Sequence, residues 1–277
     1  MVKTKMRNLA AILGMVLLTA IAGAQQPFKQ ALQQMKLDQK LGGQVPGEAK
    51  FKDEFGQDIQ FVSLLGKRPV VLLPIFFTCT GMCGKESDNL LKTIARVTTK
   101  QVGKDYDVVF LSIKPTETPE LALNKKTSLL KVMKGDTNEQ GYHFLTGELE
   151  EIRKVTDSVG FGFAYDPKDD RINHPAGLMV LSASGKIVQY LTSTEYPPKE
   201  FEAALTLASQ NKLGQKAETV LLGCVMIDPV TGQKSIVIEG VVRLTAGIFA
   251  IGVFSWIGLM IVKGRRPQVN GGTPTKA

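Results

Sequence analysis

The chain has 277 residues, 43% of them apolar, and a formal net charge of +8 at pH 7. This length is enough for one ordinary globular core with additional segments. Seven of the 34 basic residues lie in 1–24 and 244–277, which hold no acidic residue, so the middle of the chain is nearly neutral. Because the middle also lacks a stripe of Lys and Arg interleaved with aromatic residues, the composition excludes a nucleic-acid-binding protein.

Residues 1–24 have the layout of a secretory signal peptide. Basic residues precede an apolar stretch, and Ala22-Gly-Ala24 resembles a signal-peptidase cleavage site. We therefore expect an exported protein, with an uncleaved N-terminal anchor as the alternative. The following residues, 25–50, are rich in Gln, Gly and Lys and are predicted to be a lead-in of low order.

Residues 51–212 are predicted to form an α/β domain. The elements expected in chain order are a hairpin over 51–62, a buried strand over 69–77, a helix over 85–97, a strand over 107–113, a helix over 118–133, a strand over 142–146, a helix over 148–159, two strands within 176–191 and a helix over 198–211. Strands that alternate with helices and then close in a hairpin indicate a mixed sheet. Open sheets of this kind bind ligands beyond the carboxyl ends of their strands, which is where Cys79 lies.

Cys79 and Cys83 lie at the junction between a buried strand and the helix after it. Residues four positions apart share one face of a helix. The positive end of the helix dipole favours the thiolate, which serves both metal ligation and disulfide exchange. A structural disulfide is a weaker interpretation, because it would close a very short loop and contribute little stability. Met82, between the two cysteines, is expected to make an apolar contact rather than to act as a ligand.

The sequence contains only two histidines. His143 occupies an alternating position of a predicted strand and is expected to lie at the surface or the sheet edge. His174 lies in a loop just before a strand, where functional residues are common. Two sulfurs and one imidazole suit Cu(I), and Cu(II) tolerates the same atoms. Cys79, Cys83 and His174 are therefore the candidate copper ligands.

The C-terminal part of the chain is predicted to cross a membrane once. Leu244–Val262 is a run of 19 residues without a charge, long enough to span the hydrocarbon core, and we place the helix at 241–263. Basic residues follow it, so the positive-inside rule places the tail, 264–277, in the cytoplasm. The juxtamembrane segment, 213–240, contains Cys224, which is expected to be a buried thiol, with a metal-handling or intermolecular role as the alternative.

Taken together, five segments resemble the Sco/SenC/PrrC family of copper chaperones over about residues 45–212. The segments that carry the resemblance are Thr78-Cys-Thr-Gly-Met-Cys83, Leu111-Ser-Ile-Lys-Pro-Thr-Glu-Thr-Pro-Glu120, Tyr142-His-Phe-Leu-Thr-Gly147, Gly160-Phe-Gly-Phe-Ala-Tyr-Asp166 and Asn173-His-Pro-Ala-Gly-Leu-Met-Val180. The chain is also similar to bacterial members that carry a segment like Asp228-Pro-Val-Thr-Gly-Gln233 and a C-terminal span. Three positions depart from the family pattern: Gly84, Lys114 and Pro175.

The resemblance implies a thioredoxin-like fold and copper bound by Cys79, Cys83 and His174. It further implies a task in assembling the dinuclear copper centre of a haem-copper cytochrome oxidase, by delivering copper, by reducing the cysteines of the acceptor, or both. The expected protein is a membrane-tethered copper metallochaperone of the bacterial cytoplasmic membrane. Its domain would face the periplasm, and its partner would be the copper-receiving subunit of the oxidase.

Two other functions are compatible with the same residues. The first is a thiol-disulfide oxidoreductase in which Cys79 and Cys83 are the catalytic pair and copper is incidental. The second is a redox or copper sensor that signals through a membrane partner. The sequence leaves both open, and with them the question of whether the protein is an enzyme.

Overall fold

The computed structural model divides the chain into two compact units, Met1–Met226 and Ile227–Ala277. The residues that the structure describes are 35–79, 81–132, 138–217, 245–253 and 255–256. The predicted signal peptide, 1–24, and Cys224 lie outside the described residues.

The described part of the second unit is helical over 245–253 and 255–256. Large apolar side chains on it are exposed, among them Ile248, Phe249 and Trp256. Within the described residues, no helix combines the length and the apolar character needed to cross a membrane. Part of the span predicted over 241–263 lies outside those residues.

A five-stranded mixed sheet forms the centre of the first unit, in the order β5-β4-β3-β8-β9. Its strands are β3 (Val70–Ile75), β4 (Asp107–Ser112), β5 (Tyr142–Leu145), β8 (Leu178–Leu181) and β9 (Ile187–Leu191). The first three are parallel, and β8 and β9 are antiparallel to their neighbours. Every residue of β3 and β4 is buried, so both faces of the sheet must be covered.

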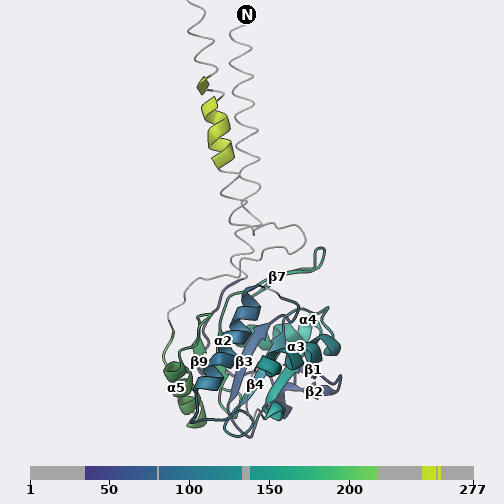
Figure 1. Ribbon diagram of the computed structural model, residues 1–277, viewed down its shortest axis with the longest axis vertical. Coiled ribbons are helices and arrows are strands. Elements are labelled where there is room, and N and C mark those ends of the chain that lie inside the picture. Colours follow the sequence, from purple (N-terminus) through teal and green to yellow (C-terminus); the bar gives the residue numbers. More distant parts are fainter. Residues whose placement is uncertain (1–34, 80, 133–137, 218–244, 254, 257–277) are drawn as a thin grey trace, which may run out of the picture. The chain divides into compact units, whose positions relative to one another are not determined.

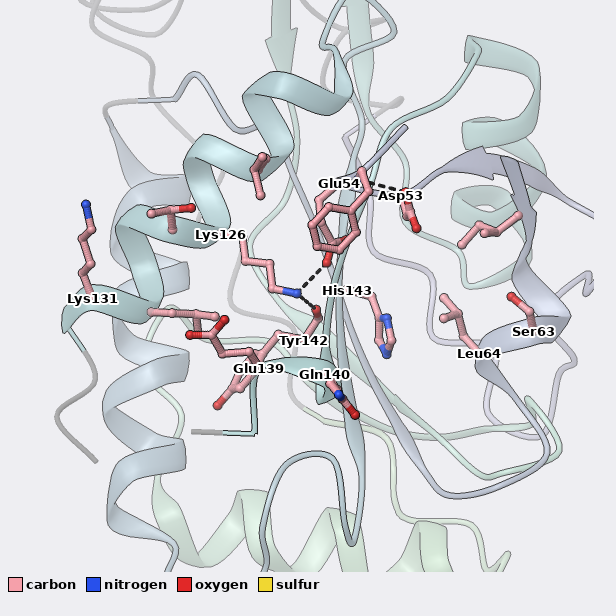
Figure 2. A pocket seen from close by; sticks show the side chains of 15 residues that line it. Asp53, Glu54, Ser63, Leu64, Lys126, Lys131, Glu139, Gln140, Tyr142 and His143 are labelled. Carbon is pink, nitrogen blue, oxygen red and sulfur yellow. Dashed lines mark hydrogen bonds and ion pairs between the residues drawn. The ribbon is translucent and has the colours of Figure 1, made fainter. Parts of the chain in front are cut away.

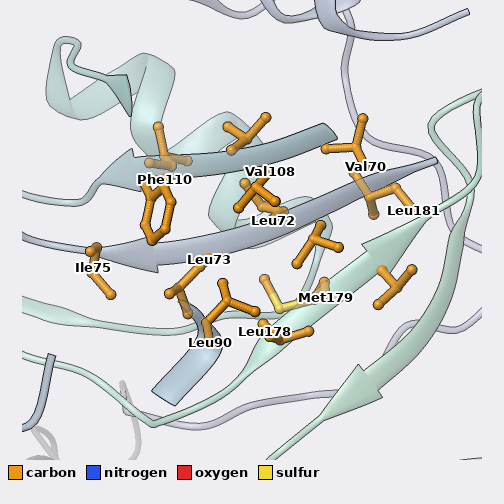
Figure 3. Close-up of a cluster of buried hydrophobic side chains, with 14 of the residues drawn as sticks. Val70, Leu72, Leu73, Ile75, Leu90, Val108, Phe110, Leu178, Met179 and Leu181 are labelled. Atoms are coloured by element: carbon orange, nitrogen blue, oxygen red, sulfur yellow. The ribbon is translucent and has the colours of Figure 1, made fainter. Parts of the chain in front are cut away.

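Within the described residues, four α-helices accompany the sheet (Figure 1). They are α2 (Met82–Arg96), α3 (Pro119–Val132), α4 (Leu149–Ser158) and α5 (Pro198–Ser209). Helix α2 contacts α3 and α5, while α5 also contacts β8 and β9. Leu90 of α2 belongs to the same buried cluster as Leu73 and Leu178, beside β3 and β8 (Figure 3). The predicted α/β domain is thus confirmed, and a mixed sheet flanked by helices fits the thioredoxin-like fold.

Two small hairpins complete the domain. The first pairs β1 (Lys50–Lys52) with β2 (Asp58–Gln60), where the sequence predicts a hairpin. The second pairs β6 (Ala164–Asp166) with β7 (Arg171–Asn173) and extends away from the sheet (Figure 1). It was not predicted, because its strands have three residues each and carry charged side chains that look like loop residues.

The chain ahead of the first hairpin packs on the domain from residue 35 onward. Leu37, Val45 and Ala49 are buried, and the Asp38 N–H donates to the carbonyl of Gly160 over 2.8 Å. A Cβ at position 160 would collide with the carbonyl oxygen of Asp38, and the φ of Gly160 is +65°. Only glycine therefore fits here. The low order expected over 25–50 therefore does not describe this part of it.

Candidate functional site

Cys79 lies just beyond the carboxyl end of β3 and just before α2. Its N–H donates to the carbonyl of Phe76 over 3.3 Å, and its side chain is buried. Gly81, the N-cap residue of α2, donates its N–H to the Cys79 sulfur over 3.4 Å. A backbone donor and the positive end of a helix both stabilise negative charge on this sulfur. Cys83 lies in the first turn of α2, but its side chain is outside the described part of the structure.

The His174 ring is enclosed by aromatic side chains in the loop that follows β7. Its exposed fraction is 0%, and its ring centroid lies 6.0 Å from that of Phe76 and 5.7 Å from that of Phe161. Its Nδ1 lies 2.8 Å from the carbonyl oxygen of Pro175. A carbonyl oxygen can only accept, so Nδ1 carries the proton and Nε2 holds the lone pair of the neutral ring. Nε2 is therefore the nitrogen suited to a metal.

Contacts between residues that the structure describes bring the His174 loop and the cysteine segment together. The ring of Phe76 contacts the imidazole of His174, and the carbonyl of Phe76 accepts the N–H of Cys79. Glu86 of α2, three residues after Cys83, accepts the N–H of Gly177 over 2.9 Å. Since Glu86 is itself buried, this bond ties the cysteine helix directly to the loop of the histidine.

Gly177 also has a conformation that other residues rarely adopt. Its φ is +142°, and a Cβ on it would lie 2.9 Å from the carbonyl oxygen of Leu191. The loop that starts at His174 therefore lies too close to β9 to leave room for a side chain at position 177.

The loop between β4 and α3 anchors the β6–β7 hairpin, which leads into His174. Lys114 pairs with Asp170 over 2.6 Å, and the Thr116 hydroxyl donates to the same carboxylate over 3.0 Å. Tyr165 donates to it as well, over 3.1 Å. Partial burial on its own would raise the pKa of Asp170, but the hydrogen bonds from Lys114, Thr116 and Tyr165 lower that pKa below its usual value.

His143 lies in a different place, on the edge strand β5. It borders a cavity of about 680 Å³, in which the amino group of Lys126 bonds to Glu54 and to the carbonyl of Tyr142 (Figure 2). Burial lowers the pKa of His143 and outweighs the opposite effect of nearby carboxylates. Glu54 also accepts the N–H of Phe144, so this pair covers the open edge of β5. The contacts of His143 belong to this cavity and not to the surroundings of Cys79.

Among the side chains that the structure describes, no group of three or more His, Cys, Asp or Glu could hold a metal ion. The three predicted ligands are not all among those side chains, because the side chain of Cys83 lies outside them. The set Cys79, Cys83 and His174 therefore stays a prediction.

Sequence reasoning missed two carboxylates beside the site, Glu86 and Glu117. Both are buried, and both accept backbone N–H groups next to the predicted ligands. Glutamate is usually found at the surface, so residue type alone gave no reason to select them. The one available signal was that Glu117 belongs to a segment of the family resemblance.

The SCO1/SenC family matches residues 38–210. The chain belongs to the SCO1/SenC family. This confirms the family that the resemblance indicated. No curated protein matches the sequence.

Several solved structures are similar to this SCO1/SenC protein. A candidate electron transfer protein from Aquifex aeolicus VF5 is 27% identical, and the match covers 62% of this chain and 95% of that protein with a TM-score of 0.55. A SCO1/SenC family lipoprotein from Bacillus anthracis str. Ames has 18% identity, with 63% and 99% covered and a TM-score of 0.51. Arabidopsis thaliana ScoI, solved with copper bound, has 18% identity, with 60% and 99% covered and a TM-score of 0.49.

Proposed function

We propose that this protein is a membrane-tethered copper metallochaperone that carries its ion between Cys79, Cys83 and His174. The copper is cargo for the copper centre of a respiratory haem-copper cytochrome oxidase, whose copper-receiving subunit is the partner. The observation that carries the proposal is the contact of the His174 ring with Phe76, whose carbonyl accepts the N–H of Cys79. A lone loop imidazole thus lies beside the segment that bears the predicted sulfur ligands.

The chemistry of these donors suits a carrier. Thiolate sulfur and imidazole nitrogen are soft enough for Cu(I) and tolerate Cu(II). Nδ1 of His174 donates to the Pro175 carbonyl, which orients the ring and leaves the lone pair on Nε2. Three protein ligands leave one side of Cu(I) open, so that a thiolate of the acceptor can attack before the donor ligands have left.

The proposed tether keeps the carrier near its acceptor. The signal sequence at 1–24 and the span at 241–263 would place the domain on the periplasmic face of the bacterial cytoplasmic membrane and the tail in the cytoplasm. The exposed side chains of Ile248, Phe249 and Trp256 in the helical part of the second unit support the membrane span, because large apolar side chains exposed on a helix are stable in lipid.

A thiol-disulfide oxidoreductase that acts on the oxidase subunit is the second candidate. The Gly81 N–H that points at the Cys79 sulfur favours it, since this donor stabilises the thiolate that attacks disulfides. The two functions share their cysteines and differ in the need for His174.

The test is Cu(I) titration of the full-length protein in detergent, against a chelator of known affinity. We expect one copper per chain, and a loss of affinity of more than about 100-fold in each of Cys79→Ala, Cys83→Ala and His174→Ala, beyond the loss typical of residues that only orient ligands. His143→Ala is the matched control and retains full affinity. Wild-type affinity in His174→Ala, with exchange activity lost only in the cysteine variants, would leave the oxidoreductase as the function.

A further inference from the structure

Glu117 is a buried carboxylate in the loop between β4 and α3, two residues before that helix begins. One oxygen accepts the N–H of Phe77 over 2.7 Å and the hydroxyl of Ser112 over 2.6 Å. The other accepts the N–H and the hydroxyl of Thr78, each over 2.7 Å. The Glu117 side chain is 5% exposed. Its bonds to Phe77 and Ser112 are buried, and its bonds to Thr78 are partly buried.

A carboxylate is the group that this position requires. Strand β3 ends at Ile75, so the N–H groups of Phe77 and Thr78 lie beyond the hydrogen-bond ladder of the sheet. The buried N–H of Phe77 needs an acceptor there, and Glu117 accepts the partly buried N–H of Thr78 as well. An ionised carboxylate offers two oxygens with about four acceptor positions, which matches four donors, and its bonds are stronger than those of a neutral amide.

The two residues held by Glu117 lie between the two halves of the candidate site. Phe76, on one side, contacts His174 with its ring. Cys79, on the other side, comes directly after Thr78 and is oriented by its own N–H bond to Phe76. If the turn over 76–79 changes shape, the sulfur of Cys79 moves relative to the imidazole.

We propose that Glu117 is a positioning residue of the copper site. It fixes the turn over 76–79 so that the Cys79 sulfur keeps one position relative to His174. Glu117 is not a ligand, since its oxygens are occupied by four donors of the turn and of Ser112. The inference rests on the proposed function and names a further residue on which that function depends.

The test variant is Glu117→Gln, which keeps the shape of the side chain but places an NH₂ donor opposite groups that also donate. Cu(I) affinity of the full-length protein in detergent is expected to fall about 10-fold to 100-fold, the range typical of residues that orient metal ligands. Thr78→Val, which removes only the hydroxyl bond, is the milder second variant and is expected to show a smaller loss.

Glu54→Gln is the matched control. Glu54 is equally buried, also accepts a backbone N–H beside the sheet, and lies at the β5 edge. It should lower thermal stability, because it also breaks the buried pair with Lys126, and leave Cu(I) affinity unchanged. Wild-type affinity in Glu117→Gln, or an equal loss of affinity in Glu54→Gln, would overturn the positioning role.

A second readout needs no copper. In chains that carry Cys83→Ala and Cys224→Ala, Cys79 is the one remaining cysteine. The rate at which iodoacetamide alkylates it then depends on the surroundings of its thiol. Glu117→Gln should change this rate, whereas Glu54→Gln should not. A wild-type protein that fails to bind copper, together with a changed rate in Glu117→Gln, would refute the proposed function and keep the positioning role. An unchanged rate would refute the positioning role even if copper binds.

Discussion

The carboxylate of Glu86 accepts a hydrogen bond from the backbone N–H of Gly177 over 2.9 Å. These residues are 91 positions apart, and their bond connects helix α2, which carries the predicted ligand Cys83, to the loop that carries the predicted imidazole. The geometry of the candidate site therefore depends on the backbone of Gly177 as much as on the side chains of the ligands.

Gly177→Ala is expected to weaken copper binding and to lower stability. The new Cβ would lie 2.9 Å from the Leu191 carbonyl at a φ of +142°, which costs about 1–3 kcal/mol. Relief of that strain would shift the Gly177 N–H relative to the Glu86 carboxylate that accepts it. Urea unfolding and Cu(I) titration measure the two effects.

Gly185→Ala is the matched control for this variant. Gly185 also has a positive φ, +82°, and its Cβ would also meet close neighbours, but it lies in the turn between β8 and β9. It should lose stability and keep its copper affinity. A Gly177→Ala protein with wild-type affinity would show that the His174 loop tolerates displacement.

The His174 ring is expected to keep its Nδ1 proton when copper binds. The Pro175 carbonyl accepts from Nδ1 over 2.8 Å, and this bond leaves only Nε2 for the ion. Nitrogen-15 NMR of the protein labelled at histidine should show a shift at Nε2 on addition of Cu(I) and a protonated Nδ1 throughout. Loss of the Nδ1 proton when copper is added would mean that the ring flips and binds the ion through Nδ1. His143 gives the internal reference spectrum.

The stability of the protein is expected to fall in acid partly through Asp170. Its pKa is lower in the folded chain than its ordinary value of 3.8, so its bonds stabilise the fold fully above that value. They are lost as the pH falls through the lower, folded pKa. Asp170→Asn should flatten the fall in the free energy of unfolding below about pH 4, and asparagine tolerates the φ of 51° found here.

The control for the acid effect is Asp169→Asn. Asp169 lies next to Asp170 in the same hairpin and forms an exposed pair with Arg171. Its replacement should leave the pH profile almost unchanged. If both variants give the same profile, the hairpin contributes through its overall charge and not through the bonds to Lys114 and Thr116.

Lys126→Met is expected to destabilise the fold by about 3–5 kcal/mol, because it leaves the Glu54 carboxylate buried without its cation. The double variant with Glu54→Gln should recover part of this loss. Chemical unfolding of the four proteins gives the coupling energy. A single variant as stable as the wild type would mean that water enters the cavity and solvates the carboxylate.

The sequence alone determined the alternation of strands and helices and the place of Cys79 beyond a buried strand. Continuous apolar runs and 3.6-residue periodicity are local properties, and they located β3, β4, α2 and α5 to within a few residues. The β6–β7 hairpin was not predicted because its strands are short and contain charged residues.

The tertiary structure alone decided what surrounds the candidate ligands. His174 lies against Phe76 and Phe161 because the fold brings together residues that are far apart in the chain. The same is true of the hydrogen bonds by which Glu86 and Glu117 hold the two loops. A glutamate that will be buried has the same local sequence signal as one that will be solvated. The difference arises only when the fold brings unpaired backbone donors to its carboxylate, and no periodicity in the sequence records where those donors will be.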